Sequence, residues 1–107
     1  MDRRLELQDL LESLLESDEV YFQPPETIRM RYPAFVYSLS NYEANHADDR
    51  PYLTRSTYEV KLITRNPEPE LVPVMASMPG FSFDRHYVAE NLHHYVFDYQ
   101  HRDRRSQ

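Results

Sequence analysis

The first sixteen residues carry leucines at the spacing of one helical face. These leucines are Leu7, Leu10, Leu11 and Leu14, with Leu15 beside them. Their i, i+3, i+4, i+7 pattern predicts an amphipathic helix over residues 2–16, with Asp2 as its N-cap. Acidic residues at its C-terminal end oppose the helix dipole, so we expect the last turn to fray. The apolar stripe is interpreted as cover for a sheet and not as a lipid- or partner-binding face.

Prolines divide the following segment into short extended pieces. Residues 20–22 and 27–31 flank Pro24 and Pro25, which cannot donate to a β-ladder, and both pieces are predicted to be strands. Residues 34–39 are apolar on both faces, which indicates a covered, central strand.

Residues 41–54 are polar and show little periodicity, which predicts a long loop. Loops of this length inside a compact domain are usually functional or disordered. The next strand, residues 55–64, places Tyr58, Val60 and Leu62 on one face, and Glu59 and Lys61 on the other. The strands on either side of the loop can pair as one long antiparallel hairpin, which we expect to project from the body.

The last third of the chain predicts a short helix and a second hairpin. The helix spans residues 70–78 and ends at Pro79-Gly80, and the hairpin pairs residues 81–87 with 92–100 around residues 89–91. Tyr95, Phe97 and Tyr99 fall on one face. The expected fold class is α+β: a mainly antiparallel sheet with a long projecting β-hairpin, packed by an N-terminal helix and a short second helix. Residues 1–101 form a single domain and residues 102–107 a polar tail.

Composition narrows the class of protein. The chain of 107 residues has room for one core, contains no cysteine, and shows neither a signal-like nor a membrane-spanning apolar run, so a soluble protein folded in cytoplasm is expected. Its net charge of −6 argues against general nucleic-acid binding. Eleven of the twelve basic residues are Arg, and nine residues are Tyr, a bias typical of protein–protein contacts or of genomic composition.

Histidines near the last hairpin are the only candidate metal ligands. If the turn spans residues 88–91, His86 lies across from His93, with Asp84 on the same face, and such a set could hold Zn²⁺. His94 points to the opposite face. Cross-strand histidine pairs are common on solvated faces, and nothing supplies supporting groups around the ligands. We therefore expect neither a metal site nor a cofactor.

No catalytic arrangement is evident. Glu43, His46, Asp48 and Asp49 stand close together in the predicted loop, but a polar loop offers no apolar pocket to shift their pKa values. A single glycine cannot build a phosphate loop. Asp84 and Arg85, as neighbours along a strand, should face opposite ways, so their partners are expected elsewhere, including on another subunit. The chain is not expected to be an enzyme.

Several short motifs follow the predicted elements. They are Arg31-Tyr-Pro33 before a strand, Ala47-Asp-Asp49 in the loop, Tyr58-Glu-Val60, Arg65-Asn-Pro67, and Phe83-Asp-Arg-His-Tyr87 followed by Glu90-Asn-Leu92. In this order they resemble the tail-completion proteins of long-tailed (siphovirus-type) bacteriophages, and within them the tail terminators of the lambda type. The resemblance covers most of the chain, and none of its motifs is a catalytic signature.

The resemblance implies a structural virion protein. In such proteins six copies close into a ring on the tail tube, end its polymerisation and present a surface to the head. The implied partners are further copies in a hexameric ring, the tail-tube protein and the head connector or stopper protein. DNA would pass through the lumen without specific binding, and no membrane is involved. The implied location is the tail–neck region of the virion, after assembly in the host bacterial cytoplasm.

The resemblance and the residue types together suggest interface residues. The expected interface consists of Asn45, His46, Asp48, Asp49 and Arg50 in the loop, and Arg55, Arg65 and Arg85 as charge anchors between subunits. The acidic pair Asp48 and Asp49 suits a DNA channel, because repulsion keeps the genome from sticking. Two other classes stay open: a head-completion or stopper protein of the phage neck, and a monomeric binding module or small hydrolase-like protein outside phage assembly.

Overall fold

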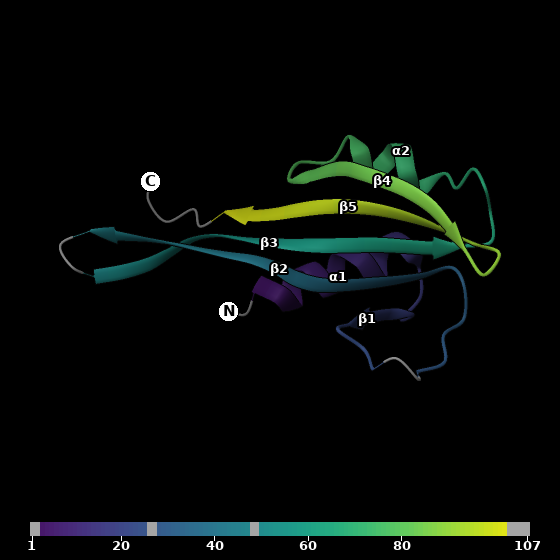
Figure 1. Ribbon diagram of the computed structural model, residues 1–107, viewed down its shortest axis with the longest axis horizontal. Coiled ribbons are helices and arrows are strands. Elements are labelled where there is room, and N and C mark those ends of the chain that lie inside the picture. The colour runs from purple at the N-terminus through teal and green to yellow at the C-terminus, as the bar shows by residue number, and fades with distance from the viewer. Residues whose placement is uncertain (1–2, 26–27, 48–49, 103–107) are drawn as a thin grey trace.

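The computed structural model describes residues 3–25, 28–47 and 50–102, with only the backbone course for residues 3, 41–47, 50–56 and 101–102. The elements in chain order are α1 (Arg3–Leu15), β1 (Val20–Phe22), β2 (Ala34–Ala47), β3 (Arg50–Thr64), α2 (Leu71–Ala76), β4 (Phe81–Ala89) and β5 (Leu92–Arg102). The strands form one sheet in the order β1-β2-β3-β5-β4, in which only the β1–β2 pair is parallel. This architecture confirms the α+β class (Figure 1).

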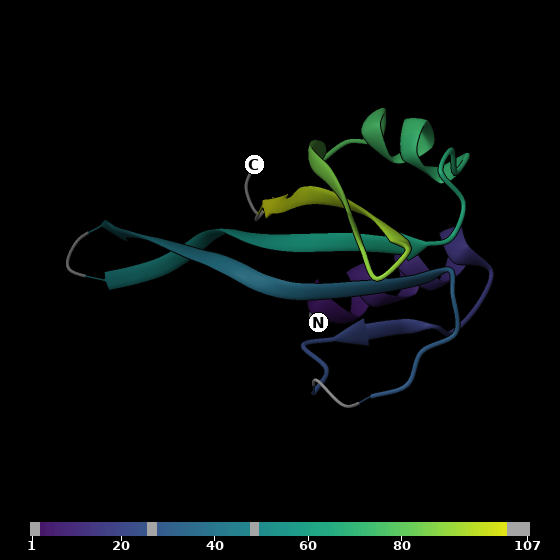
Figure 2. The same cartoon turned by 45° about the vertical axis from the view of Figure 1, so that its right-hand side comes forward.

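Both helices pack on the same face of the sheet. In Figure 1, α1 lies behind β2 and β3, and Figure 2 shows α2 beside β4, toward the β4 edge of the sheet. Leu7 and Leu11 of α1 and Met75 of α2 share one apolar core. The sheet contributes alternate residues of its strands to this core: Phe35, Tyr37, Tyr58, Val60, Leu62, Tyr95, Phe97 and Phe81. The predicted inward faces of β3 and β5 are therefore confirmed.

The helix α1 is fixed to the sheet by polar bonds as well as by its leucines. The Tyr37 hydroxyl donates to Oε1 of Gln8 at 2.6 Å, and Nε2 of Gln8 donates to the carbonyl of Val20 at 3.2 Å. Backbone at Glu16, with φ of 58°, leaves the helical conformation directly after Leu15. The predicted helix is confirmed, and its predicted N-cap Asp2 lies outside the described residues.

The segment between β1 and β2 differs from the prediction. Residues 28–31 do not join the sheet, and Thr27 lies outside the described residues. Ile28 is 36% exposed, and the backbone N–H of Arg31 donates to the Glu19 carboxylate at 3.2 Å in place of a strand neighbour. The prediction of a strand over residues 27–31 was wrong, because alternation in sequence cannot supply a partner strand at the sheet edge.

The predicted long loop is a second correction. Most of residues 41–54 continue the strands: β2 runs on to Ala47 and β3 begins at Arg50. Their register continues through Ala47↔Arg50, with irregularities after Leu39 and after Glu43. Two adjacent segments of one hairpin can pair through their backbones even when neither has an apolar face. A strand is recognised in a sequence by its alternating apolar residues, so the sequence predicted a loop for these polar strands. The projecting hairpin itself is confirmed (Figure 2).

The second helix and the final hairpin were predicted with small errors. The helix spans six residues, with Pro73 inside it, and is shorter than the predicted residues 70–78. The turn of the last hairpin consists of Glu90 and Asn91, with φ of 53° and 65°, as a tight hairpin turn requires. The ladder therefore pairs His86 with Tyr95, and not with His93.

Candidate interaction surface

The outer half of the β2–β3 hairpin extends beyond the rest of the sheet. We call residues 44–47 and 50–53 the arm. Within the described part of the chain, they pair only with each other, because the β3–β5 ladder begins at Arg55↔Arg102 and the β1–β2 ladder ends at Phe22↔Tyr37. The molecule accordingly measures 51 × 31 × 23 Å. The register irregularities in β2 lie at the base of the arm, where bulges bend and twist a strand pair.

Three of the predicted interface residues map to the arm. Asn45, His46 and Arg50 belong to the strands near the tip. Asp48 and Asp49 lie outside the described residues. The structure thus places Asn45, His46 and Arg50 together on one projecting hairpin. In the described residues this part of the hairpin is paired strand and not the predicted loop.

The three arginines proposed as charge anchors are dispersed. Arg55 stands at the base of the arm, opposite Arg102 in the ladder. Arg65 follows the other end of β3, where its guanidinium carbon lies 5.7 Å from the centre of the Tyr32 ring. Arg85 lies on β4. They do not form one cluster, so each would meet a different part of a partner.

The sheet face opposite the helices has no helix over it in the described part of the chain. We call it the open face; its residues include Val36, Glu59, Lys61, His94, Val96, Asp98, Arg85 and Tyr87. Val96 is fully buried although no helix covers it. In the register it lies between Lys61 and Arg85, whose long side chains can cover it with their aliphatic stems. The open face is thus a charged layer over a small apolar base.

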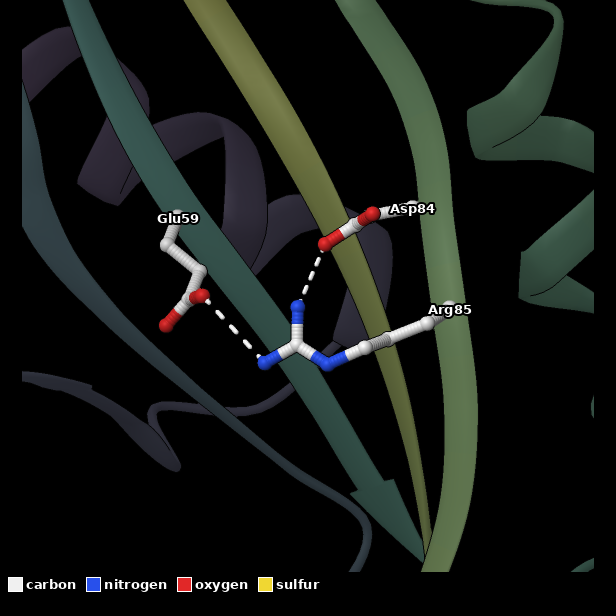
Figure 3. Close-up of polar contacts among 3 residues, drawn as sticks. All are labelled: Glu59, Asp84 and Arg85. Carbon is white, nitrogen blue, oxygen red and sulfur yellow. Dashed lines mark hydrogen bonds and ion pairs between the residues drawn. The ribbon is translucent and has the colours of Figure 1, made fainter.

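Arg85 is the centre of the charges on the open face. Its Nη2 lies 3.7 Å from Oε2 of Glu59, and its Nη1 bonds the Asp84 carboxylate (Figure 3). Figure 3 shows the three side chains in front of the strands, with α1 behind them. The prediction that Asp84 and Arg85 face opposite ways was wrong, because a register shift between Phe83 and Arg85 breaks the strand alternation.

Asp98 adds a third carboxylate beside this cluster. It stands directly opposite Glu59 across the β3–β5 ladder, where like charges are destabilising. Burial raises the pKa of the Asp98 carboxyl, nearby Asp84 and Glu59 raise this pKa further, and Arg85 opposes them. Asp98 also lines a shallow hollow at the base of the arm, together with Thr57, Gly80, Phe81, Ser82 and Gln100. Asp98 is the one ionisable side chain among these lining residues.

Aromatic rings occupy the other end of the open face. The rings of Tyr87 and His94 are stacked, with centres 4.6 Å apart and planes within 8°. Nδ1–H of His94 donates to the carbonyl of Leu92 at 3.1 Å, and burial lowers the pKa of the imidazole.

The sequence did not predict the open face as a candidate site. The available signal was the outward placement of Glu59 and Lys61, but their neighbours depend on the pairing of β3 with β5.

The strand β4 forms the edge of the sheet beside β5. Two of its apolar side chains are exposed, Phe83 by 46% and Val88 by 55%. Phe83 still contacts the core through Phe97, whose ring centre is 5.4 Å away. A nine-residue edge with exposed apolar side chains is a surface to which another chain can add, although the irregularity at Asp84 and the charge of Arg85 oppose indiscriminate pairing.

The described residues hold no group of three or more His, Asp or Glu side chains arranged to bind a metal ion. The three residues weighed as metal ligands from the sequence, His86, His93 and Asp84, are not brought together, because Asp84 bonds Arg85 on the open face. His86 and His93 do meet, with Nε2 and Nδ1 3.0 Å apart. Among the same described residues, no helix is both long and apolar enough to cross a membrane.

Comparison with known proteins adds no family assignment. No protein-family model matches the chain, and no curated protein is significantly similar to it in sequence.

Proposed function

We propose that this chain is a structural assembly protein of a long-tailed bacteriophage, a tail terminator that caps the tail tube as a ring and forms the head–tail joint. The arm is the observation that carries the proposal. It is a two-stranded ribbon outside the sheet, and an isolated pair of strands is only marginally stable in water. A partner that covers the arm would supply the stability that the body does not.

The positions of the arm, the open face and the β4 edge support assembly into a ring. They are different surfaces on one chain, and the arm extends away from the body that carries the other two (Figure 1). A contact between two unlike surfaces of identical copies is heterologous, and such contacts generate a closed ring when the rotation between copies allows it. In this proposal the arm of one copy contacts the tube or the next copy.

The charge pattern supports the DNA channel. The chain carries a net charge of −6, and Asp48 and Asp49 occupy the tip of the hairpin in sequence. A negative lumen would repel the genome and allow it to pass without binding. We propose that the ring orients part of this acidic surface inward.

Electron microscopy of phage particles made with and without this gene product tests the proposal. In its absence we expect complete heads and separate tails of excessive or irregular length. Normal-length free tails beside heads that leak DNA would instead assign the chain to head completion. Intact infectious particles would overturn both assignments. Rescue by the wild-type chain supplied in trans is the control that assigns the defect to this protein.

A further inference from the structure

Two histidines near the end of the β4–β5 hairpin approach each other in an unusual way. Nε2 of His86 lies 3.0 Å from Nδ1 of His93, although the two residues are not direct partners in the ladder. The planes of the imidazole rings are within 9° of each other and their centres are 5.2 Å apart. One nitrogen must donate its hydrogen to the other, so the pair shares a single proton along this contact.

The neighbouring tyrosine fixes the orientation of this pair. The ring of His86 stacks on that of Tyr95, with centres 4.5 Å apart and planes within 20°. Tyr95 is buried, and its hydroxyl donates to the carbonyl of Pro67 at 2.5 Å. His86 itself is exposed and His93 is half-buried, so solvent reaches the pair. The buried ring of Tyr95 supports His86 from the side of the core.

The separation of the two nitrogens suits one metal ion. Two nitrogens at adjacent positions of a metal, with bonds of about 2.0–2.1 Å, lie about 2.9–3.4 Å apart. Imidazole nitrogen is a preferred ligand of Zn²⁺, Cu²⁺ and Ni²⁺. Both rings rotate away from the line that joins the two nitrogens so that their lone pairs meet at one point, and the ion replaces the shared hydrogen.

We infer that His86 and His93 form a two-histidine site for a divalent transition metal of the Zn²⁺ class. The protein supplies two nitrogens, and water completes the coordination, since the described residues provide no third ligand. The bound ion links the edge strand β4 to β5 beside their turn and so stabilises the sheet edge. This inference does not depend on the proposed role in phage assembly.

Isothermal titration of the untagged, full-length protein with ZnCl₂ at pH 7.5 tests the site. We expect one ion per chain, and at least tenfold weaker binding in each of His86→Ala and His93→Ala. His94→Ala is the matched control, since His94 is adjacent in sequence but lies on the open face, stacked on Tyr87. It should bind as the wild type does. Absence of heat in the wild type, or full binding by both His86→Ala and His93→Ala, would overturn the inference.

Thermal unfolding provides a second readout that does not rely on the heat of binding. An ion that binds only the folded chain raises the melting temperature in proportion to the logarithm of its concentration. We expect this rise in the wild type and in His94→Ala, and its loss in His86→Ala. A rise that persists in His86→Ala would place the ion elsewhere. Far-ultraviolet circular dichroism checks that each variant is folded.

Discussion

The two halves of the β2–β3 hairpin belong to one ladder, but one half lies in the sheet and the other projects from it. The inner half, from Ala34 to Leu39 and from Tyr58 to Thr64, lies within the sheet and contributes five residues to the core that α1 covers: Phe35, Tyr37, Tyr58, Val60 and Leu62. The outer half, the arm, has no third strand beside it in the described part of the chain. The comparison shows that backbone pairing alone extends a hairpin, whereas burial decides which part of it belongs to the fold. The arm is thereby left for a partner.

The sharpest test of this division removes a core side chain. Phe97→Ala deletes a fully buried ring that meets Phe81 edge-on with centres 6.3 Å apart. The resulting cavity should lower the free energy of unfolding by about 3–5 kcal/mol, measured by urea denaturation. Phe83→Ala, which removes a half-exposed ring in contact with Phe97, is the control and should cost about 1 kcal/mol. Equal losses in the two variants would mean that the core face is assigned wrongly.

The second test concerns the approach of α2 to the sheet. Gly80 has a φ of 88°, and a Cβ added there would lie 2.9 Å from Cε1 of Tyr99 and 3.1 Å from the backbone oxygen of Gln100. Gly80→Ala should therefore lower the free energy of unfolding by about 1–3 kcal/mol, because strain and crowding add. Ser82→Ala, at an exposed position two residues on, should change it by less than about 0.5 kcal/mol. No loss in Gly80→Ala would show that this turn can relax.

The third test separates the open face from the core. Because the folded state raises the pKa of Asp98, the protonated form is favoured in that state. The protonated carboxyl of Asp98 therefore stabilises the folded state below its ordinary pKa of 3.8. This stabilisation is lost as the pH rises through the raised pKa of the folded state. Asp98→Asn should therefore stabilise the protein at pH 7, by up to about 1 kcal/mol, and not at pH 3. Urea denaturation at both pH values measures this difference.

A matched change provides the control for Asp98. Asp9→Asn makes the same substitution at an exposed position of α1 and should shift the free energy of unfolding by less than about 0.5 kcal/mol at either pH. If Asp98→Asn destabilises the protein at pH 7, the carboxylate makes a favourable contact that outweighs its neighbours Glu59 and Asp84.

The smallest effect on stability is expected in the arm. Ala44 and Leu53 are partners in the ladder, so residues 45–52 can be replaced by Asn-Gly, which closes a tight hairpin turn. The free energy of unfolding should change by less than about 0.5 kcal/mol, while complementation of phage lacking the gene should fail, with tails of uncontrolled length. An unfolded variant would mean that the arm is part of the fold. A folded variant that complements fully would remove the arm from the proposed assembly role.

The sequence by itself determined the α+β class, both helices and the core faces of β3 and β5. These features follow from local periodicity, since Leu7 and Leu11 share a helical face and Val60 and Leu62 alternate on a strand. It also placed Asn45, His46 and Arg50 on a projecting hairpin. Two sequence predictions were wrong: a strand over residues 27–31 and a loop over residues 41–54. Alternation over residues 27–31 did not show that a partner strand was lacking, and the backbone ladder over residues 41–54 left no apolar periodicity.

Only the tertiary structure decided which side chains meet on the sheet. The irregularity at Asp84 joins it to Arg85, and the order β3-β5-β4 places Glu59, Asp98 and Arg85 on one face. The register of the last hairpin likewise pairs His86 with Tyr95 and not with His93, although the side chains of His86 and His93 are in contact. Contacts of this kind join residues that are distant in sequence, so their geometry depends on strand order and on a one-residue shift, which local patterns do not encode.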